Sequence, residues 1–456
     1  MTALHGANPA PIRCPADHHF DLLIRDATLL ADPATALLTP SSFLAATNGT
    51  IAAMGPMSAL PPQYHADQTI DARGGILMPG LINCHSHAAM SLFRGLADDL
   101  PLMTWLTEHI FPAEAAWVEP EMVYWCSRLA AMEMVLAGTT CLADGYFHED
   151  AAAQAFCEVG IRTVAAQGII DFPAPGVPDP ADNITTAADF LQRWHSTSPL
   201  LSPALFCHSP YTCSQTTLRQ AKTLAREHNT LLFIHLAETA WEVEQSHKQH
   251  GLSPTGLLDS LGVLDAQTVC VHGVCLDEED IGLLRKNNAR LVTCPESNMK
   301  LASGIAPLPA LLAEGIPLGL GTDGCASNND QDLFREMGSC ARLHKVSGGD
   351  PNLLPARQLL AMATCGGAEV LGMEGLMGRL AVGMQADCIV VDRQQPRRTP
   401  THDMEALVYS GQGNDVRTTV VGGKVIMHDR CMLSCDLQGT MATVRQMAEK
   451  VMATRT

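Results

Sequence analysis

Residues 74–87 read GGILMPGLINCHSH, an apolar run that ends in two histidines. A short apolar segment bounded by glycine and proline predicts a β-strand buried on both faces. On a strand, residues two apart point to the same side, so the imidazoles of His85 and His87 face the same way. This stretch therefore predicts a buried strand with a pair of metal-ligand side chains at its carboxyl end.

Seven further apolar runs follow, each succeeded by a polar or helix-like stretch. They are TTCLAD, RTVAAQGI, PALFCH, LLFIHL, TVCVHG, ARLVTC and PLGLGTD. Eight β-then-α units over residues 74–378 favour a closed parallel barrel over an open sheet. We therefore predict an α/β fold in which this region forms a metal-dependent (β/α)8 barrel of the TIM type.

The two ends of the chain predict a second, smaller unit. Short β-type runs fill residues 19–73 and return over residues 379–435, in ADCIVVD and RTTVVGGKVIMHD. Neither set has enough strands to bury a face by itself, so we expect both to pair in one small β-sandwich domain. Residues 1–18 are expected to form a disordered tail, and residues 436–456 a C-terminal helix.

The composition favours a cytoplasmic protein. The chain has 456 residues, 46% of them hydrophobic, and a formal net charge of −19 from 48 acidic and 29 basic residues. No cluster of Lys and Arg stands out, which argues against nucleic acid as a partner. The 16 cysteines form no Cys-x-x-Cys pair and are expected to be reduced. No apolar stretch is long enough for a membrane span or a signal peptide.

Several of the apolar runs end in residues that bind metals. Besides the first pair, LLFIHL contains His235, TVCVHG contains His272, and GLGTD ends in Asp323. The carboxyl ends of all strands of a (β/α)8 barrel meet at one face, where these side chains would gather. Each has an ordinary alternative, namely a core histidine or, for Asp323, a helix cap. Their joint placement at four strand ends favours one metal site.

Glu238 lies three residues after His235, in the sequence HLAET. One interpretation is a capping or solvated carboxylate in the first turn of the next helix. Its position beside a predicted metal ligand favours the other interpretation, a proton shuttle above the metal.

The segments PGLINCHSH, HLAE, VHG, CPESNMKL and GLGTDGCASNN together resemble the motifs of the amidohydrolase superfamily. They are most similar to those of its methylthioadenosine/S-adenosylhomocysteine deaminase family, over residues 20–430. The resemblance implies a hydrolytic deaminase that acts on the 6-amino group of an adenine nucleoside. The metal ligands that it implies are His85, His87, His235 and Asp323. The catalytic residues that it implies are Glu238, His272 and Asp323.

One metal ion is expected rather than two. Some superfamily members bridge two metals with a carboxylated lysine at a strand end, but RTVAAQGIID contains no lysine. Three neutral histidines and one carboxylate suit Zn²⁺, and Fe²⁺ accepts the same ligands. We expect one Zn²⁺ per chain. In catalysis Asp323 would accept the proton of the attacking water, His272 would orient the nucleophile, and Glu238 would protonate N1 of the adenine ring.

The same resemblance implies a site for a small-molecule nucleoside. A segment of the type WLxxxIFPxE runs from Trp105 to Glu114, and Glu114 corresponds to the glutamate that holds the ribose hydroxyls. His208, in CHSPYTC, corresponds to a histidine that contacts the purine. Without the resemblance, Glu114 would be a solvated helix end and His208 a structural histidine.

The substituent at the 5′ carbon is expected to be uncharged. Family members that accept S-adenosylhomocysteine carry arginines near one barrel strand and in the loop after it. Gln167 stands where the first is expected, and the loop DFPAPGVPDPADNITT has no arginine or lysine. This ranks 5′-methylthioadenosine first, adenosine second and S-adenosylhomocysteine third. Met103, Trp105 and Phe172 are candidates for an apolar 5′ pocket, although such residues are more often core.

Other functions fit parts of the pattern. The same fold and metal suit deamination of guanine, 8-oxoguanine, cytosine, a pterin or a triazine. A two-metal site would suit amide-ring hydrolysis, and a non-catalytic barrel would serve as a scaffold, although no chemical residue is missing. The family resemblance implies a homodimer. Glu296, in CPESN, stands where relatives usually carry a small or neutral residue, and the sequence leaves its role open.

Overall fold

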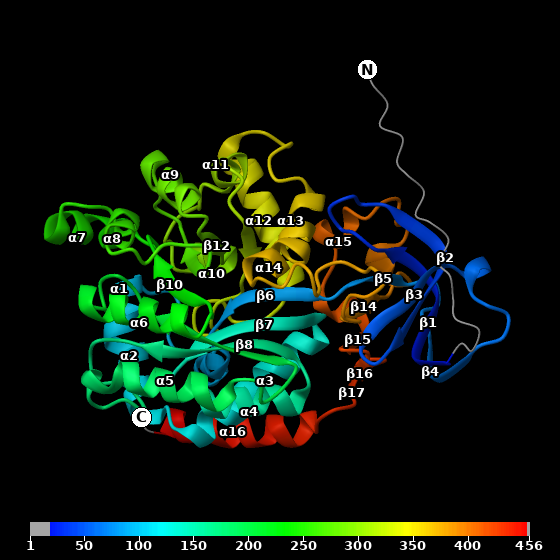
Figure 1. The fold of residues 1–456 in the computed structure, drawn as a ribbon, viewed down its shortest axis with the longest axis horizontal. Helices are drawn as coiled ribbons and strands as arrows, with labels where there is room; N and C mark the ends of the chain where they lie inside the picture. The colour runs from blue at the N-terminus through cyan, green and yellow to red at the C-terminus, as the bar shows by residue number, and fades with distance from the viewer. Residues whose placement is uncertain (1–18, 454–456) are drawn as a thin grey trace.

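The computed structural model describes residues 19–453, which form an eight-stranded parallel barrel and a nine-stranded mixed sheet (Figure 1). The disordered tail predicted for residues 1–18 lies outside the described residues. Within residues 19–453, no helix is long and apolar enough to cross a membrane.

The eight predicted apolar runs each contribute one barrel strand, so the predicted TIM-type barrel is confirmed. The strands are β6 (Leu81–Ser86), β7 (Thr139–Tyr146), β8 (Arg162–Ile169), β9 (Leu201–Cys207), β10 (Leu232–Leu236), β11 (Thr268–His272), β12 (Arg290–Thr293) and β13 (Leu318–Leu320). They pair in chain order, each parallel to the next. Alternate residues such as Ile82, Cys84, Val164 and Ala166 fill the interior, which makes the barrel a packed core.

The seam between the last and first strands is closed by loop backbone and by glycine. The N–H groups of Thr322 and Asp323 both donate to the carbonyl oxygen of His85, each over 3.1 Å. At Gly321 a Cβ atom would lie 2.8 Å from the Cβ of His85, and at Gly319 it would lie 2.7 Å from the Sγ of Cys84. The repeated glycine of GLGTD therefore lets β13 approach β6 closely enough to complete the barrel.

Helices surround the barrel. They are α1 (Leu102–Thr104), the π-helical turn η3 (Trp105–Ile110), α2 (Phe111–Trp117), α3 (Pro120–Leu136), α4 (Glu149–Val159), α5 (Asn183–Trp194), α6 (Gln215–Glu227), α7 (Ala240–His250), α8 (Pro254–Ser260), α9 (Glu278–Lys286), α10 (Pro295–Lys300), α11 (Leu308–Ala313), α12 (Leu333–Gly348), α13 (Ala356–Met362), α14 (Cys365–Val370), α15 (Ala406–Tyr409) and α16 (Leu437–Ala453). Their ends follow local chemistry: α9 begins with a capping box in which Asp277 accepts from the N–H of Asp280 at 2.9 Å. The C-terminal helix α16 packs against α3 (Figure 1).

The mixed sheet joins both ends of the chain, as predicted. It contains β1 (His19–Leu30), β2 (Leu38–Thr47), β3 (Thr50–Pro56), β4 (His65–Asp71), β5 (Ile76–Pro79), β14 (Cys388–Val391), β15 (Val416–Val421), β16 (Lys424–His428) and β17 (Cys431–Met432). The two ends meet where β14 pairs antiparallel with β5.

The stretch GILMPGLINCH is two strands rather than the single one predicted. Residues before Gly80 form β5 in the mixed sheet, and residues after it form β6 in the barrel. The chain changes sheets here because Pro79 has no N–H to continue a ladder, and because only glycine fits at position 80, where a Cβ atom would lie 2.0 Å from the Oγ1 of Thr140. The domain limits assigned from the sequence stay a prediction.

Candidate active site

The carboxyl ends of the barrel strands bring the predicted metal ligands to one point. His85 lies near the end of β6, His87 directly after it, His235 on β10 and Asp323 after β13. The ring centroids of His85 and His87 are 4.6 Å apart, and that of His235 lies 5.2 Å from the first and 5.4 Å from the second. Three imidazoles from distant parts of the chain thus lie together at one end of the barrel.

The donor atoms have the spacing of a coordination shell. The Nε2 atoms of His85 and His87 each lie 3.4 Å from the Oδ1 of Asp323. One ligand atom from each of His85, His87 and His235 falls within 4.8 Å of the others. His85, His272 and Asp323 form a second group within the same limit. Two ligands bound about 2.1 Å from one ion at a tetrahedral angle are about 3.4 Å apart, so the spacing of His85, His87 and Asp323 fits a single cation.

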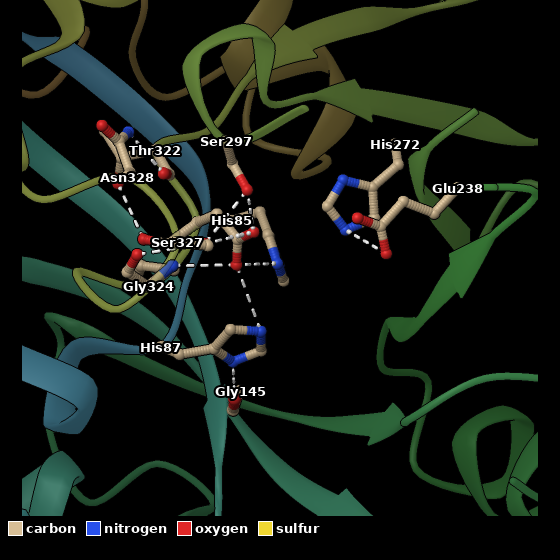
Figure 2. A network of polar contacts seen from close by, with 12 residues as sticks. His85, His87, Gly145, Glu238, His272, Ser297, Thr322, Gly324, Ser327 and Asn328 are labelled. Atoms are coloured by element: carbon tan, nitrogen blue, oxygen red, sulfur yellow. Dashed lines mark hydrogen bonds and ion pairs between the residues drawn. The ribbon is translucent and has the colours of Figure 1, made fainter. Parts of the chain in front are cut away.

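Two of the histidines have a ring nitrogen without a hydrogen-bond partner, which bears on whether these residues can bind a metal. Within residues 19–453, the Nε2 atoms of His85 and His235 are buried and have no hydrogen-bond partner. Buried polar atoms are almost always paired, so two unpaired nitrogens beside a carboxylate fit a metal ion as their partner. The Nδ1 of His87 lies 2.6 Å from the carbonyl oxygen of Gly145 and donates to it, which leaves the lone pair on Nε2 facing the centre (Figure 2).

Three hydrogen bonds from neighbouring residues hold the Asp323 carboxylate in place. The hydroxyls of Ser297 and Ser327 donate to its Oδ2 at 2.7 and 3.0 Å, and the N–H of Gly324 donates to its Oδ1 at 2.8 Å (Figure 2). Burial alone would raise the pKa of Asp323, but the surrounding imidazoles, His85 first among them, lower it well below its usual range. The carboxylate is therefore held ionised at the centre of the site.

Glu238 and His272 face each other beside this centre (Figure 2). The Nε2 of His272 lies 3.8 Å from the Oε2 of Glu238, and the Nδ2 of Asn298 donates to the Nδ1 of His272 over 3.1 Å. Burial lowers the pKa of His272 to about 4, so the ring is neutral and carries its hydrogen on Nε2. Burial, followed by the charge of Asp323, raises the pKa of Glu238 to about 8.

Strain marks the same positions. The φ angles of His272 and Asp323 are +76° and +62°, values that side chains other than glycine rarely adopt. Left-handed backbone at a non-glycine residue costs on the order of 1–3 kcal/mol and is retained where function requires it. Both residues lie at or just after the carboxyl end of a strand, and both line the cavity beside it.

A cavity of about 370 Å³ opens beside the predicted metal centre. Its lining includes Glu238, His272 and Asp323, together with Trp105, Glu114, Phe172 and His208. The volume is in the range of small-molecule sites, and most of the wall is aromatic or aliphatic. The cavity therefore fits one small, largely apolar ligand with a few polar contacts.

Glu114 is a further buried carboxylate of the cavity wall. It is 8% exposed, and the Tyr146 hydroxyl donates to its Oε1 over 2.6 Å. Burial raises the pKa of Glu114 to about 7, against a smaller opposite effect of the Tyr146 hydrogen bond. His208 is held by the Thr212 hydroxyl, 2.9 Å from its Nδ1, and burial lowers its pKa to about 3, so that ring is neutral too.

Two predicted residues do not reach the cavity. Gln167 follows Ala166, which points into the barrel, so its side chain lies on the outer face of β8, where its Nε2 donates to the carbonyl oxygen of Gly168 at 3.2 Å. Gly168 lines the cavity in its place. Met103 is 36% exposed and is not part of the wall. The strand alternation that places Ala166 inward excludes its neighbour.

Other residues of the site were not predicted. Tyr146, Tyr211 and Phe206 line the cavity. Asp144, which ends TTCLAD, accepts from the Ser86 hydroxyl and the Ala88 N–H, both at 2.7 Å, and so fixes the residues on either side of His87. Its position at a strand end, like that of Asp323, was the signal in the sequence. Ser297 and Asn298 lie in the quoted segment CPESNMKL, but nothing in their spacing revealed their partners.

Glu296 lies outside the cavity that holds the candidate site. Its backbone N–H donates to the Oε2 of the buried Glu336 at 3.1 Å, and its Oε1 accepts from the Ser339 hydroxyl at 2.6 Å. These contacts tie the start of α10 to α12. Glu296 therefore helps to hold the helix that carries Ser297 and Asn298.

Comparisons with known proteins agree with this geometry. Residues 76–426 match the amidohydrolase family. A 5-methylthioadenosine/S-adenosylhomocysteine deaminase of Syntrophobacter fumaroxidans is 44% identical over 431 residues, covering 94% of this chain and 98% of that protein. One of Syntrophus aciditrophicus is 43% identical, covering 94% and 97%. The crystal structure of an adenosine deaminase from Xanthomonas campestris with bound zinc has a TM-score of 0.93 and 35% identity, covering 96% of this chain and all of that one.

Proposed function

This chain belongs to the amidohydrolase family and, within it, to the methylthioadenosine/S-adenosylhomocysteine deaminases, as its motifs predicted, and from that premise we propose which reaction it catalyses. It is a hydrolase of C–N bonds. The proposed reaction removes the 6-amino group of an adenine nucleoside and releases ammonia and the inosine-type product. The observation that carries the proposal is that His85, His87 and His235 form one group of possible metal ligands, and that the Oδ1 of Asp323 lies 3.4 Å from the Nε2 of the first two.

We propose that one Zn²⁺ per chain is held by His85, His87, His235 and Asp323, with Fe²⁺ as the alternative ion. The orphan Nε2 atoms of His85 and His235 and the ionised Asp323 carboxylate support this assignment. When bound, such a cation supplies Lewis acidity, which lowers the pKa of water from 15.7 to about 7 and provides a nucleophile near neutral pH.

In the proposed reaction, Asp323, His272 and Glu238 each have a different role in proton transfer or in orienting the water. The Asp323 carboxylate accepts a proton from the attacking water and passes it to the 6-amino group, which leaves as ammonia while the new C6 hydroxyl gives its proton to the Glu238 carboxylate. The Nε2–H of His272 donates a hydrogen bond that orients the water oxygen toward C6. Glu238, whose pKa is about 8, holds a proton near neutral pH and transfers it to ring N1, where electron density accumulates as C6 is attacked. The Ser303 hydroxyl, which donates to the Oε1 of Glu238 at 3.2 Å, orients that carboxyl.

Glu114 and His208 are proposed to select a nucleoside over a free base. An ionised carboxylate accepts from two vicinal hydroxyls, and Glu114 is a buried carboxylate at the cavity wall. The neutral ring of His208 is available to contact the purine. Trp105 and Phe172 add apolar surface, with Phe172 packed edge-on against Phe111 at 5.7 Å between ring centroids.

The cavity favours an uncharged 5′ group. Among the described residues that line it, none is a lysine or arginine, and the loop residues Phe172, Pro173, Ala174 and Pro175 form part of its apolar wall. An amino-acid end would bring a carboxylate into this wall without a cationic partner, which is costly. The proposed order is 5′-methylthioadenosine, then adenosine, then S-adenosylhomocysteine. Gln167 itself does not line the cavity, and it matters here only because the family members that accept S-adenosylhomocysteine have an arginine at this position.

An ultraviolet assay of adenine-to-hypoxanthine conversion tests the proposal. We expect kcat/KM to fall in the order 5′-methylthioadenosine, adenosine, S-adenosylhomocysteine, with free adenine lowest. A higher value for S-adenosylhomocysteine than for methylthioadenosine would overturn the order. No conversion of any of the four by the zinc-loaded protein would reject the reaction and favour another heterocycle, such as guanine or a triazine, or a scaffold role.

The Glu114→Ala variant separates a nucleoside deaminase from a deaminase of a free base. It is expected to lose activity on the ribosylated substrate and to leave activity on the free base unchanged. The homodimer and the cytoplasmic location implied by the sequence belong to the same proposal and call for a measurement of mass in solution and of location in the cell.

A further inference from the structure

The sequence His-x-Asp occurs twice on one face of the mixed sheet, in His19-Phe20-Asp21 and His65-Ala66-Asp67. Strands β1 and β4 pair in parallel with His19 opposite His65 and Phe20 opposite Ala66. Phe20 is only 4% exposed and packs in the core of the sheet. The flanking His and Asp side chains therefore project from the opposite, solvent-exposed face of two adjacent strands.

Three of these side chains present their ligand atoms to one another. The Nε2 atoms of His19 and His65 lie 3.0 and 3.6 Å from the Oδ1 of Asp67. The two rings are 5.1 Å apart between centroids, and one ligand atom from each of the three residues falls within 4.8 Å of the others. These separations are close to those of ligands about 2.1 Å from a shared ion.

The surroundings favour a cation. Asp21 extends the same face, but its Oδ2 accepts from the backbone N–H of Asn48 at 2.6 Å, so it adds negative charge rather than a ligand. The site residues have side chains 53, 73 and 57% exposed, for His19, His65 and Asp67, which leaves room for water molecules to complete a coordination shell. The strand backbone beneath is fixed by buried Phe20, so only side-chain freedom is lost on binding.

We propose that His19, His65 and Asp67 form a second divalent-metal site, separate from the barrel centre. Two imidazoles and one carboxylate favour Zn²⁺, Ni²⁺ or Cu²⁺ over Mg²⁺ and Ca²⁺, which prefer all-oxygen shells. The bound ion joins β1 to β4 and so closes the segment that contains β2 and β3. Binding to the folded chain alone stabilises it in proportion to the logarithm of metal concentration.

Equilibrium dialysis of the full chain against Zn²⁺ tests the site, with bound metal counted by elemental analysis. We expect wild type to take up one equivalent more than His65→Ala and Asp67→Asn at saturation. His250→Ala, which removes an exposed histidine of α7, is the matched control and should bind as wild type does. Equal uptake by wild type and both site variants at every Zn²⁺ concentration would overturn the proposal.

Thermal unfolding with Ni²⁺ gives a second readout. Added Ni²⁺ should raise Tm in wild type and in His250→Ala, and should raise it less in His65→Ala. An equal rise in all three proteins contradicts the site. This inference does not depend on the proposed deaminase reaction: His65→Ala should keep full activity, and His85→Ala should keep the surface equivalent while it loses the one in the barrel.

Discussion

The backbone N–H of Asp323 donates to the carbonyl oxygen of His85 over 3.1 Å. This hydrogen bond joins the end of β6 to the loop after β13, the first and last strands of the barrel. The Oδ1 of Asp323 lies 3.4 Å from the Nε2 of the same histidine. Closure of the barrel and assembly of the proposed metal centre therefore depend on the same two residues, and changes at the seam should affect both.

Replacement of His85 by alanine should release the barrel metal. The side chain is 1% exposed, and its Nε2 faces Asp323 with no other partner among the described residues. Bound zinc should fall by one equivalent, measured by elemental analysis. The measurement is cleanest in a His65→Ala background, because the proposed surface site would otherwise add to the count. An unchanged zinc content in that background would contradict His85 as a ligand.

Glu238→Gln should keep its metal and lose turnover. The amide has nearly the shape of the carboxyl but cannot transfer a proton to N1, and a general acid contributes about 10²- to 10⁴-fold. We expect kcat to fall by that factor, with zinc content unchanged. A variant with near-normal kcat would refute the proton-transfer role. Ser303→Ala, which removes only the hydroxyl that orients this group, should show a much smaller loss.

The activity on nucleosides should rise with pH through about 7. Burial raises the pKa of Glu114 to about 7, so below that pH the carboxyl is protonated and can no longer accept from both ribose hydroxyls. The kcat/KM for methylthioadenosine should therefore fall about tenfold per pH unit on the acid side. Glu114→Gln should lower the value and remove this dependence.

The Tyr146→Phe variant tests whether Glu114 is the group that titrates in this pH profile. The Tyr146 hydroxyl donates to Glu114 and stabilises its charged form, which lowers the pKa of the carboxyl. Loss of the donor should move the acid limb of the profile to higher pH. If wild type, Tyr146→Phe and Glu114→Gln all give the same dependence of kcat/KM on pH, a group other than Glu114 causes the fall in activity at low pH.

Asn298→Ala should reduce kcat without loss of metal. The Nδ2 of Asn298 donates to the Nδ1 of His272 and thereby keeps the hydrogen on Nε2, where it faces Glu238. Partners that orient a ring in this way are typically worth 10- to 100-fold. Asn298→Asp would instead accept from Nδ1 and reverse the tautomer, so it should be impaired at least as much. Full activity in Asn298→Asp would exclude this role.

The pattern of apolar runs was sufficient to predict the barrel, because each parallel strand is buried on both faces and is bounded by turn residues. It was also sufficient to bring His85, His235 and Asp323 together, since strand ends share one face. The division of one run at Gly80 was missed, because periodicity cannot tell two consecutive strands of different sheets from one long strand. Gln167 lies outside the cavity because side chains alternate along β8, so it points outward next to the inward Ala166; its correspondence to a family position carries no information on this register.

Gly321 lies at the seam between β13 and β6, where no side chain fits. At Gly321 a Cβ atom would lie 2.8 Å from the Cβ of His85 and 2.9 Å from its carbonyl oxygen, and neither neighbour is the end of a flexible side chain. Gly321→Ala should therefore push β13 from β6 and destabilise the fold by about 1–3 kcal/mol, the usual cost of overpacking. Gly282→Ala is the matched control: it lies within α9 with no atom within 4 Å of the new Cβ, and should be neutral or stabilising by up to about 1 kcal/mol. Urea unfolding of metal-loaded and metal-stripped protein measures both effects. Because the displaced strand also moves Asp323, the loss for Gly321→Ala should be larger in the loaded protein, and an equal loss in the two forms would show that the seam and the metal centre are independent.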